Sequence, residues 1–559
     1  MPTLTTSFTL LVTFAAMLCA MPARAGEAVR TPTLNSIQHI VVIYAENRSF
    51  DNLYGQFPGA DGIANATPAQ YEQRDRNGEL LTFLPPVWQS PASRSAAPLA
   101  DTRFPAQLAN RPFAIDDPHG AALALNVATR DLVHRYYQHI EQINGGKLDQ
   151  FAAVSDAGAL TMGYYAGANL ELWKLAQEYT LADHFFMGAF GGSFLNHFWL
   201  VCACTPEFKD APPEMRAVLD QHGHLERSAD SPARAMDGPP RYSGDFAVTP
   251  DGYAVNTVQP PFQPSGLAPL LSDPSRADPA AHPLPPQTAN TIGDTLSARS
   301  VTWAWYAGAW RDAQADALHP PANRSVIYKS ENGAANFQPH HQPFNYFAKY
   351  APGTAERLAH LKDAEEFFEA IDYGALEEVS FYKPSGNVNQ HPGYTDVQSG
   401  DQHIADVVRR IQASTLWPST LIIITYDENG GLWDHVPPPQ GDRFGPGTRI
   451  PAIIISPFAR KHYIDSTVYD TTSIAKLITR RYNLTPLPGV RAGVGDLTAA
   501  LDIATAPLKK KDKKEKKDKG GKHKKHDKHD KHAESVKQTR ERQPPTKQRK
   551  SDLQIFDAP

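Results

Sequence analysis

Three short stretches of the chain are almost continuously apolar and rich in β-branched residues. They are residues 37–44 (IQHIVVIY), 421–426 (LIIITY) and 450–456 (IPAIIIS). Apolar runs of this length are typical of strands buried on both faces, as in a parallel sheet. The pattern therefore predicts three buried strands.

Helical patterns separate these runs. In residues 402–413 the apolar side chains recur at helical spacing, and residues 471–482 predict a further helix capped by Asp470 or Thr471. Residues 47–54 are typical of a loop that enters a helix. Strands that alternate with helices indicate an α/β fold with a mostly parallel sheet.

The folded core is predicted to span residues 26–507 as one domain. Within it, residues 205–291 are rich in Pro, Asp, Ser and Gly. Such composition favours a long irregular excursion at the surface, which could serve as a lid or form a small subdomain.

The first 25 residues resemble a secretory signal. An apolar stretch over residues 8–21 leads to Ala23-Arg24-Ala25, a small-x-small cleavage site, although no Lys or Arg precedes the apolar stretch. A buried N-terminal helix is the alternative. We expect an exported protein, periplasmic or secreted, and no other apolar run approaches the ~20 residues of a membrane span.

Composition and charge restrict the class of protein. The 559 residues are 41% hydrophobic and 21% charged, which is typical of a globular protein and excludes a fibrous or fully disordered one. The formal net charge is -5, yet residues 509–550 hold 19 Lys and Arg against 7 Asp and Glu. The remaining body is therefore acidic, which argues against a nucleic-acid partner.

The C-terminal segment, residues 508–559, is a low-complexity tail rich in Lys and His. It holds few apolar residues to bury, so we expect disorder. Its charge suits an anionic polymer of the cell envelope or a membrane surface, its histidines could capture metal weakly, or it only increases solubility.

Two cysteines remain once the signal is removed, Cys202 and Cys204. Cysteines separated by one residue are poorly placed to bond to each other, so we expect two buried thiols. The alternative is one half of a zinc site, for which the sequence offers no second pair.

Acidic and amide side chains directly follow two of the predicted strands. Glu46 and Asn47 come after residues 37–44, and Asp427 and Glu428 come after residues 421–426. Ligands of open α/β sheets bind at the carboxyl ends of the strands. Buried carboxylates need compensation, and these oxygens suit a hard or borderline divalent cation. Each acid alone could instead cap a helix or lie in a loop.

A Gly-Gly-Ser turn, Gly191-Gly192-Ser193, offers a candidate nucleophile. The glycines allow a tight turn, and Ser193 is expected to be exposed at a helix N-terminus, where backbone N–H groups favour an anion. A serine hydroxyl needs a base or a metal to become nucleophilic. The alternative is an ordinary capping serine.

Several histidines lie in polar contexts typical of loops. They are His119, the pair His340 and His341, and His391. Gathered in one site they could bind phosphoryl oxygens or protonate a leaving group. Singly, each would be a surface or core residue, and spacing does not assemble them.

Taken together, these segments resemble the bacterial phosphoesterase family of phospholipase C-type enzymes and acid phosphatases, within the alkaline phosphatase-like superfamily. The resemblance covers residues 37–485. The segments that carry it are HIVVIYAENRSFDNLYG, DHFFMGAFGGSFLNHFWL, TWAWYAG, NQHPGYTDVQSGDQHI and TYDENGGLWDHVPPP.

The resemblance implies a doubly wound three-layer α/β/α core with one divalent metal ion of unknown identity. It implies the metal ligands Glu46, Asn47, Ser193, Asp427 and Glu428. Ser193 is then the nucleophile of a phosphoserine intermediate. Asn47, His119, His391 and one of the pair His340 and His341, for which we favour His341, contact the phosphoryl group. Asp434 and His435 share a signature with these residues without an assigned step.

The family resemblance leaves the substrate open between two classes of ester. A secreted acid phosphatase acting on phosphomonoesters is favoured over a phospholipase C that cleaves lipid headgroup phosphodiesters. The reason is that the larger phospholipases of the family carry further β-rich domains and a twin-Arg signal, and this sequence shows neither. The third alternative is an envelope-binding module with a degenerate site, which the presence of every site residue disfavours.

Overall fold

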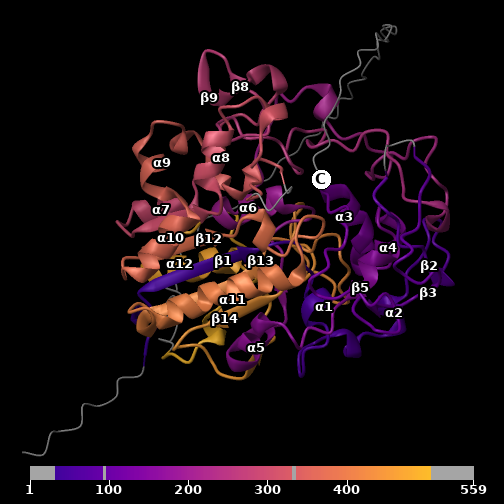
Figure 1. Ribbon diagram of the computed structural model, residues 1–559, viewed down its shortest axis with the longest axis horizontal. Coiled ribbons are helices and arrows are strands. Elements are labelled where there is room, and N and C mark those ends of the chain that lie inside the picture. Colours follow the sequence, from indigo (N-terminus) through magenta and orange to yellow (C-terminus); the bar gives the residue numbers. More distant parts are fainter. Residues whose placement is uncertain (1–31, 92–95, 330–334, 505–559) are drawn as a thin grey trace, which may run out of the picture.

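The computed structural model describes residues 32–91, 96–329 and 335–504, so the expected signal and basic tail lie outside the described residues (Figure 1). Its centre is an eight-stranded sheet in the order β11-β10-β12-β1-β13-β14-β6-β15. The strands are β1 (His39–Ala45), β6 (Thr180–Ala182), β10 (Trp303–Ala307), β11 (Leu361–Asp363), β12 (Val379–Lys383), β13 (Thr420–Tyr426), β14 (Ala452–Ile455) and β15 (Tyr463–Asp465).

The sheet is parallel except at β14, which runs against both of its neighbours, β13 and β6. The chain between β13 and β14 forms turns and no crossover helix. A parallel neighbour needs such a crossover, so the third apolar run returns antiparallel. The prediction of a mostly parallel sheet is confirmed.

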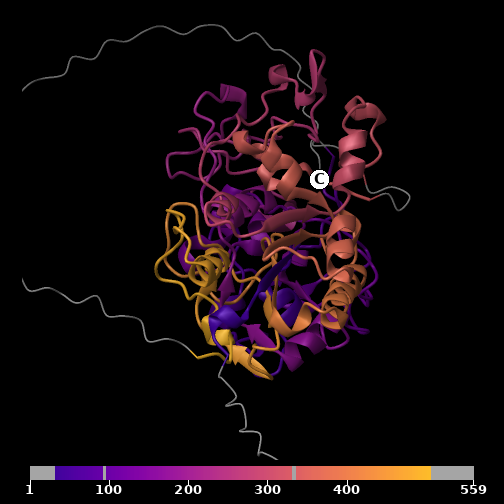
Figure 2. The ribbon, with the colours of Figure 1, turned by 90° about the vertical axis from the view of Figure 1, so that its left-hand side faces the viewer.

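Helices cover both faces of the sheet, and Figure 2 shows α11 and α12 on opposite sides of the strands. On one face α5 packs against α11 and α11 against α10, and on the other α12 packs against α6 and α6 against α7. These helices are α5 (Glu171–Glu178), α6 (Ser193–Cys202), α7 (Ile292–Ser297), α10 (Ala364–Asp372), α11 (Val397–Ala413) and α12 (Thr472–Tyr482). The expected α/β/α layers are confirmed.

The predicted strands and helices correspond to observed elements. All seven residues of β13 and six of the seven in β1 are buried, because these strands lie mid-sheet with helices on both faces. Thr471 is the residue before α12. The loop after β1 enters the short helix α1 (Phe50–Tyr54), with Ser49 capping it.

The excursion over residues 205–291, which the structure describes throughout, contains two short strands and three 3-10 turns. The strands β8 (Pro269–Leu270) and β9 (Asp273–Ala277) lie at the top of Figure 1, near α8 (Trp310–Asp316) and α9 (Ala355–His360). Most of this segment lies outside helices and strands. Its role as a lid or subdomain, like the domain boundaries, stays a prediction.

Smaller elements surround this core. They are α2 (Pro68–Tyr71), β2 (Phe83–Leu84), β3 (Leu108–Ala109), β4 (Phe113–Ala114), α3 (Tyr136–Ile143), α4 (Phe151–Val154), β5 (Gly163–Tyr164), β7 (Phe185–Phe186) and β16 (Tyr469–Asp470). Within the described ranges, no helix has the length and apolar character needed to cross a bilayer.

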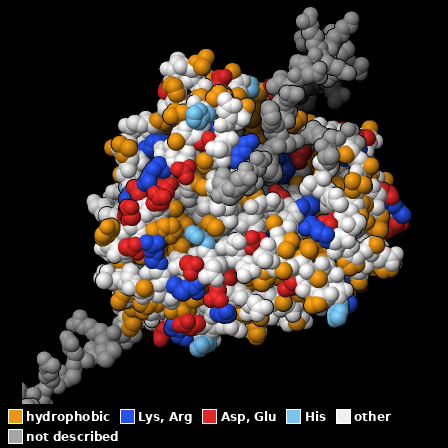
Figure 3. Space-filling view, in the orientation of Figure 1, with side chains coloured by type: hydrophobic (Ala, Val, Ile, Leu, Met, Phe, Trp, Pro, Cys, Tyr) orange, Lys and Arg blue, Asp and Glu red, His pale blue; other side chains and the backbone are white. Residues whose placement is uncertain are grey.

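Acidic and basic side chains lie close together on the face shown in Figure 3. Exposed ion pairs include Arg409 with Asp406 at 2.6 Å and Arg311 with Glu365 at 2.8 Å. Exposed pairs of this kind contribute little to stability, so the fold depends on its buried contacts.

The expectation of two separate thiols is wrong, because the structure joins Cys202 and Cys204 by a disulfide. Ala203, at the end of α6, adopts a left-handed conformation with φ 48° and ψ 43°. This turn brings the two Cα atoms to 5.1 Å, within the usual range for a disulfide. Sequence spacing alone does not reveal such a turn.

We predict that the chain, expressed in an oxidising compartment and unfolded without reductant, contains no free thiol at Cys202 or Cys204. Thiol titration with Ellman's reagent checks this, and prior reduction should release two thiols per chain. Two reactive thiols in the unreduced sample would contradict the disulfide.

Candidate active site

Three neighbouring strands at the centre of the sheet each bring a charged residue to the same edge. Lys383 ends β12, Glu46 follows β1, and Asp427 follows β13. The register pairs residues near the ends of these strands, Ala45 with Tyr426 among them. All three charged side chains are fully buried. The expected cluster at the carboxyl edge therefore exists, with a lysine added.

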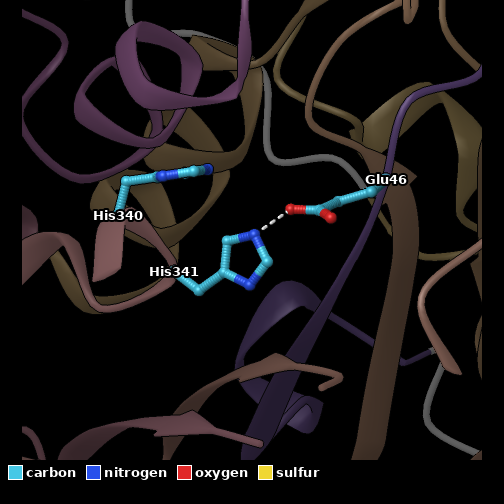
Figure 4. A group of neighbouring side chains, drawn as sticks. All are labelled: Glu46, His340 and His341. Atoms are coloured by element: carbon cyan, nitrogen blue, oxygen red, sulfur yellow. Dashed lines mark ion pairs between the residues drawn. The ribbon is translucent and has the colours of Figure 1, made fainter. Parts of the chain in front are cut away.

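Glu46 is surrounded by hydrogen-bond donors. Its Oε1 lies 2.8 Å from Lys383 Nζ. The same oxygen contacts His341 Nε2, and Figure 4 shows this ion pair. Its Oε2 accepts from the Asn389 amide and from the Tyr394 hydroxyl at 2.9 Å. Burial would raise the pKa of Glu46, but His341 and Lys383 lower it well below its usual range. Glu46 is therefore an anion.

Asn47 connects the two acidic loops to the serine. Its backbone N–H donates to Asp427 Oδ1 at 3.2 Å, and its Oδ1 lies 3.2 Å from Ser193 Oγ. Its φ is +57°, in the left-handed region that asparagine tolerates. A Cβ at Gly430 would lie 2.5 Å from the Asn47 carbonyl oxygen, so this close approach needs glycine. The side-chain Nδ2 of Asn47 is buried without a hydrogen-bond partner.

Ser193 is the first residue of α6, as the sequence predicts, but it is only 6% exposed. Its Oγ lies 3.1 Å from Glu428 Oε1, which can accept its proton. The preceding turn is tightly packed: a Cβ at Gly191 would lie 2.6 Å from Tyr136 N. The expectation of an exposed serine is thus wrong, because neighbouring loops cover it.

Burial outweighs the nearby positive charge at Asp427 and Glu428. Burial raises the pKa of Asp427 to about 6 and the pKa of Glu428 to about 8. Asp427 Oδ2 has no hydrogen-bond partner, and Lys383 Nζ is 3.9 Å away from it. Together with the oxygens of Asn47 and Ser193, this donor set fits a divalent cation.

The described residues contain four groups of acids and histidines whose ligand atoms lie within 4.8 Å of one another. Two of these groups include Glu46: one with His340 and His341, and one with His197 and Asp427. Metal binding is therefore compatible with the centre on chemical grounds.

Among the histidines predicted for the site, His341 and His391 lie in it. His341 contacts Glu46, and His391 is buried against Tyr394 with ring centroids 4.2 Å apart. His340 packs on His341, with the centroids 4.8 Å apart, and makes no ion pair with Glu46 (Figure 4). The preference for His341 over His340 agrees with this arrangement.

His119 is not brought to the cluster. It is exposed on a turn where its backbone N–H donates to Asp117 Oδ1, and no contact among the described residues connects its ring to Ser193 or the acids. The histidine that lies beside the acids is His134, whose Nε2 is 3.7 Å from Glu428 Oε1. Burial would lower the pKa of His134, but Glu428 and other acids raise it to about 9.

Sequence reasoning missed three residues of this cluster: His134, His197 and Lys383. Lys383 carries the same signal as the acids, a charge at the end of an apolar run (VSFYK). His197 lies one helical turn after Ser193, and its Nδ1 lies 2.7 Å from the Ser193 carbonyl oxygen. His134 has no local signal, because its loop reaches the site through tertiary contacts, among them close packing on Gly191 and Gly192.

A buried ion network fixes the two acidic loops to each other. Arg449 Nε donates to Asp434 Oδ1 at 2.8 Å, and its Nη2 donates to Asp51 Oδ1 at 3.2 Å. His435 Nδ1 lies 2.6 Å from Asp51 Oδ2, and Asp51 N–H donates to Asp434 Oδ2. Asp434 and His435 therefore position the loops, while Asn47, Asp427 and Glu428 face the serine.

Comparison with known proteins matches residues 37–485 to the model of the Phosphoesterase family. Phospholipase C B of Mycobacterium tuberculosis is 23% identical over 517 residues, which cover 86% of this chain and 80% of that protein. Phospholipase C A of the same organism is 25% identical over 511 residues, 85% of this chain and 79% of the relative.

Similarity extends to larger relatives and to solved structures. A non-hemolytic phospholipase C of Burkholderia pseudomallei is 24% identical over 528 residues. The match covers 85% of this chain and 60% of that protein. A crystal structure of an alkaline phosphatase superfamily protein from Vibrio parahaemolyticus aligns with a TM-score of 0.29 and 9% identity, covering 67% of this chain and 71% of that one.

We predict that Arg449→Met lowers the free energy of unfolding by about 3–5 kcal/mol, because it leaves Asp51 and Asp434 buried without their cation. Urea unfolding followed by circular dichroism measures this. Arg443→Met is the matched control: Arg443 is exposed and paired with Asp251 at 2.6 Å, so its loss should cost less than about 1 kcal/mol. Equal losses in both variants would contradict a special role for the network.

Proposed function

The chain belongs to the Phosphoesterase family, and from this premise we propose that Ser193 attacks the phosphorus of a phosphoric ester and carries the phosphoryl group as phosphoserine. Hydrolysis of phosphoric ester bonds agrees with the family and with the phospholipase C relatives. The observation that carries the proposal is the buried hydroxyl of Ser193, which lies between Asn47 Oδ1 and the carboxylate of Glu428.

We propose that one divalent ion is held by Glu46, Asn47, Ser193, Asp427 and Glu428. When bound, such an ion lowers the pKa of the serine hydroxyl and offsets negative charge on the phosphoryl oxygens. The unpartnered oxygen of Asp427 and the acid pair beside the serine support this assignment.

The surrounding side chains supply the remaining chemistry. Asn47 Nδ2, buried without a partner, is free to donate a hydrogen bond to a phosphoryl oxygen. His134, with its raised pKa, is a cation at neutral pH that can bind the phosphoryl group or protonate the departing alkoxide. We assign to His134 the role expected for His119. We propose that His391 and His341 also lie beside the phosphoryl group.

Phosphomonoesters are the substrates we propose first. A monoester has one more ionisable oxygen than a diester, and the cationic His134 beside Glu428 can accommodate its charge. The second candidate is a phospholipase C, which the names of the relatives at 23% and 25% identity favour. Both reactions use the same serine and the same acids.

We propose that the protein is exported. The apolar stretch ending in Ala23-Arg24-Ala25 predicts a signal, and the Cys202–Cys204 disulfide is typical of proteins in oxidising compartments.

Ser193→Ala is expected to reduce turnover of p-nitrophenyl phosphate at least ~10³-fold, because the covalent route is lost. Release of p-nitrophenol measures this, with p-nitrophenylphosphorylcholine assayed in parallel. Acid quenching of the wild type during turnover should give a phosphorylated peptide that contains Ser193. Preference for the choline diester would favour the phospholipase, and full activity of the alanine variant would contradict the mechanism.

His134→Gln should lower kcat/KM on the monoester by ~10²-fold or more, because it removes a cation beside the phosphoryl group. His119→Gln is the matched control and should leave kcat/KM unchanged, since His119 is exposed and no contact among the described residues connects its ring to Ser193 or the acids. Steady-state kinetics at several pH values compare the two. A loss confined to His119→Gln would reverse the assignment.

A further inference from the structure

Lys383 is a fully buried cation placed between two carboxylates from neighbouring strands. Its Nζ lies 2.8 Å from Glu46 Oε1 and 3.9 Å from Asp427 Oδ2, and 5.3 Å from the centre of the Tyr44 ring. Burying a lysine is costly unless an anion compensates it. The positive charge of Lys383 therefore affects the carboxylates of the site and makes no contribution at the protein surface.

Lys383 and His134 supply positive charge to different carboxylates of the cluster. Glu46, Asp427 and Glu428 are all fully buried. His134 Nε2 lies 3.7 Å from Glu428 Oε1, whereas Lys383 Nζ lies beside Glu46 and Asp427. Without the lysine, Glu46 and Asp427 would lose their neighbouring ammonium group and would attract a further cation.

The carboxylates beside Lys383 Nζ belong to a group of side chains that could bind a metal ion. Glu46, His197 and Asp427 offer ligand atoms within 4.8 Å of one another, and His341 Nε2 contacts the same Glu46 oxygen as the lysine. Asp427 Oδ2 and His197 Nε2 are buried without hydrogen-bond partners. A mixed set of histidine and carboxylate ligands suits zinc or manganese.

We infer that Lys383 Nζ takes the place of a second metal ion, so that the centre holds one ion instead of two. The inference rests on the proposed metal-assisted function and assigns Lys383 as a positioning residue. The ammonium group holds Glu46 in its orientation and repels a cation from the ligands Glu46, Asp427 and His197.

The test is the number of metal ions bound per chain. Full-length wild type, Lys383→Ala and Lys383→Arg are loaded with excess Mn²⁺ and desalted, and the metal is measured by mass spectrometry against protein concentration. Lys362→Ala is the matched control, because Lys362 also lies on a strand of the sheet and pairs with a carboxylate, that of Glu377 at 2.6 Å. All four proteins carry the same basic tail, so differences between them report on the centre.

We expect one ion per chain in the wild type, Lys383→Arg and Lys362→Ala, and one more in Lys383→Ala. In Lys383→Ala the paired ions should also give an electron paramagnetic resonance spectrum of coupled Mn²⁺. Two ions in the wild type, or one ion in a folded Lys383→Ala, would overturn the inference while leaving the serine mechanism intact.

If Lys383→Ala fails to fold, Lys383→Met is prepared with Mn²⁺ present throughout. Two ions in the folded methionine variant support the inference. Failure of both variants to fold overturns it, since an ion would then be unable to replace the lysine. A wild type that turns over phosphoester through Ser193 without any bound ion overturns the proposed metal itself.

Discussion

The sheet buries carboxylates at its carboxyl edge, and the structure depends on cations and hydrogen-bond donors that offset their negative charge. Glu46 and Asp427 follow two adjacent central strands, and neither can reach bulk water. A buried anion needs a cation or hydrogen-bond donors close to it. Glu46 has both in Lys383 and His341, whereas Asp427 and Glu428 retain raised pKa values because burial outweighs their partners. This imbalance is the observation on which the proposed cation site beside Ser193 depends.

The loops that carry the acids are held by contacts outside the centre. Arg449 joins Asp51 to Asp434, and the left-handed backbone at Asn47 lies against Gly430. Such contacts hold the ligand atoms before any substrate arrives, so little reorganisation is needed during the reaction. Residues that do not face Ser193 therefore hold the loops of the site in place.

Much of the fold could be predicted from sequence, because fully buried strands leave a local signal. The runs at β1 and β13 and the acids after them correspond to observed strands and a shared edge. The partner of Glu428 was missed, because His134 reaches it through a turn that no local pattern records. The disulfide was missed for a similar reason, since it depends on the left-handed backbone at Ala203.

The measurement that tests the central claim most directly is anomalous X-ray diffraction from crystals grown with Mn²⁺ and collected at the manganese edge. The account predicts one strong peak within coordination distance of oxygens from Glu46, Asn47, Ser193, Asp427 and Glu428. A peak at the separate group of Asp51, Asp434 and His435, or none at the serine, would contradict it.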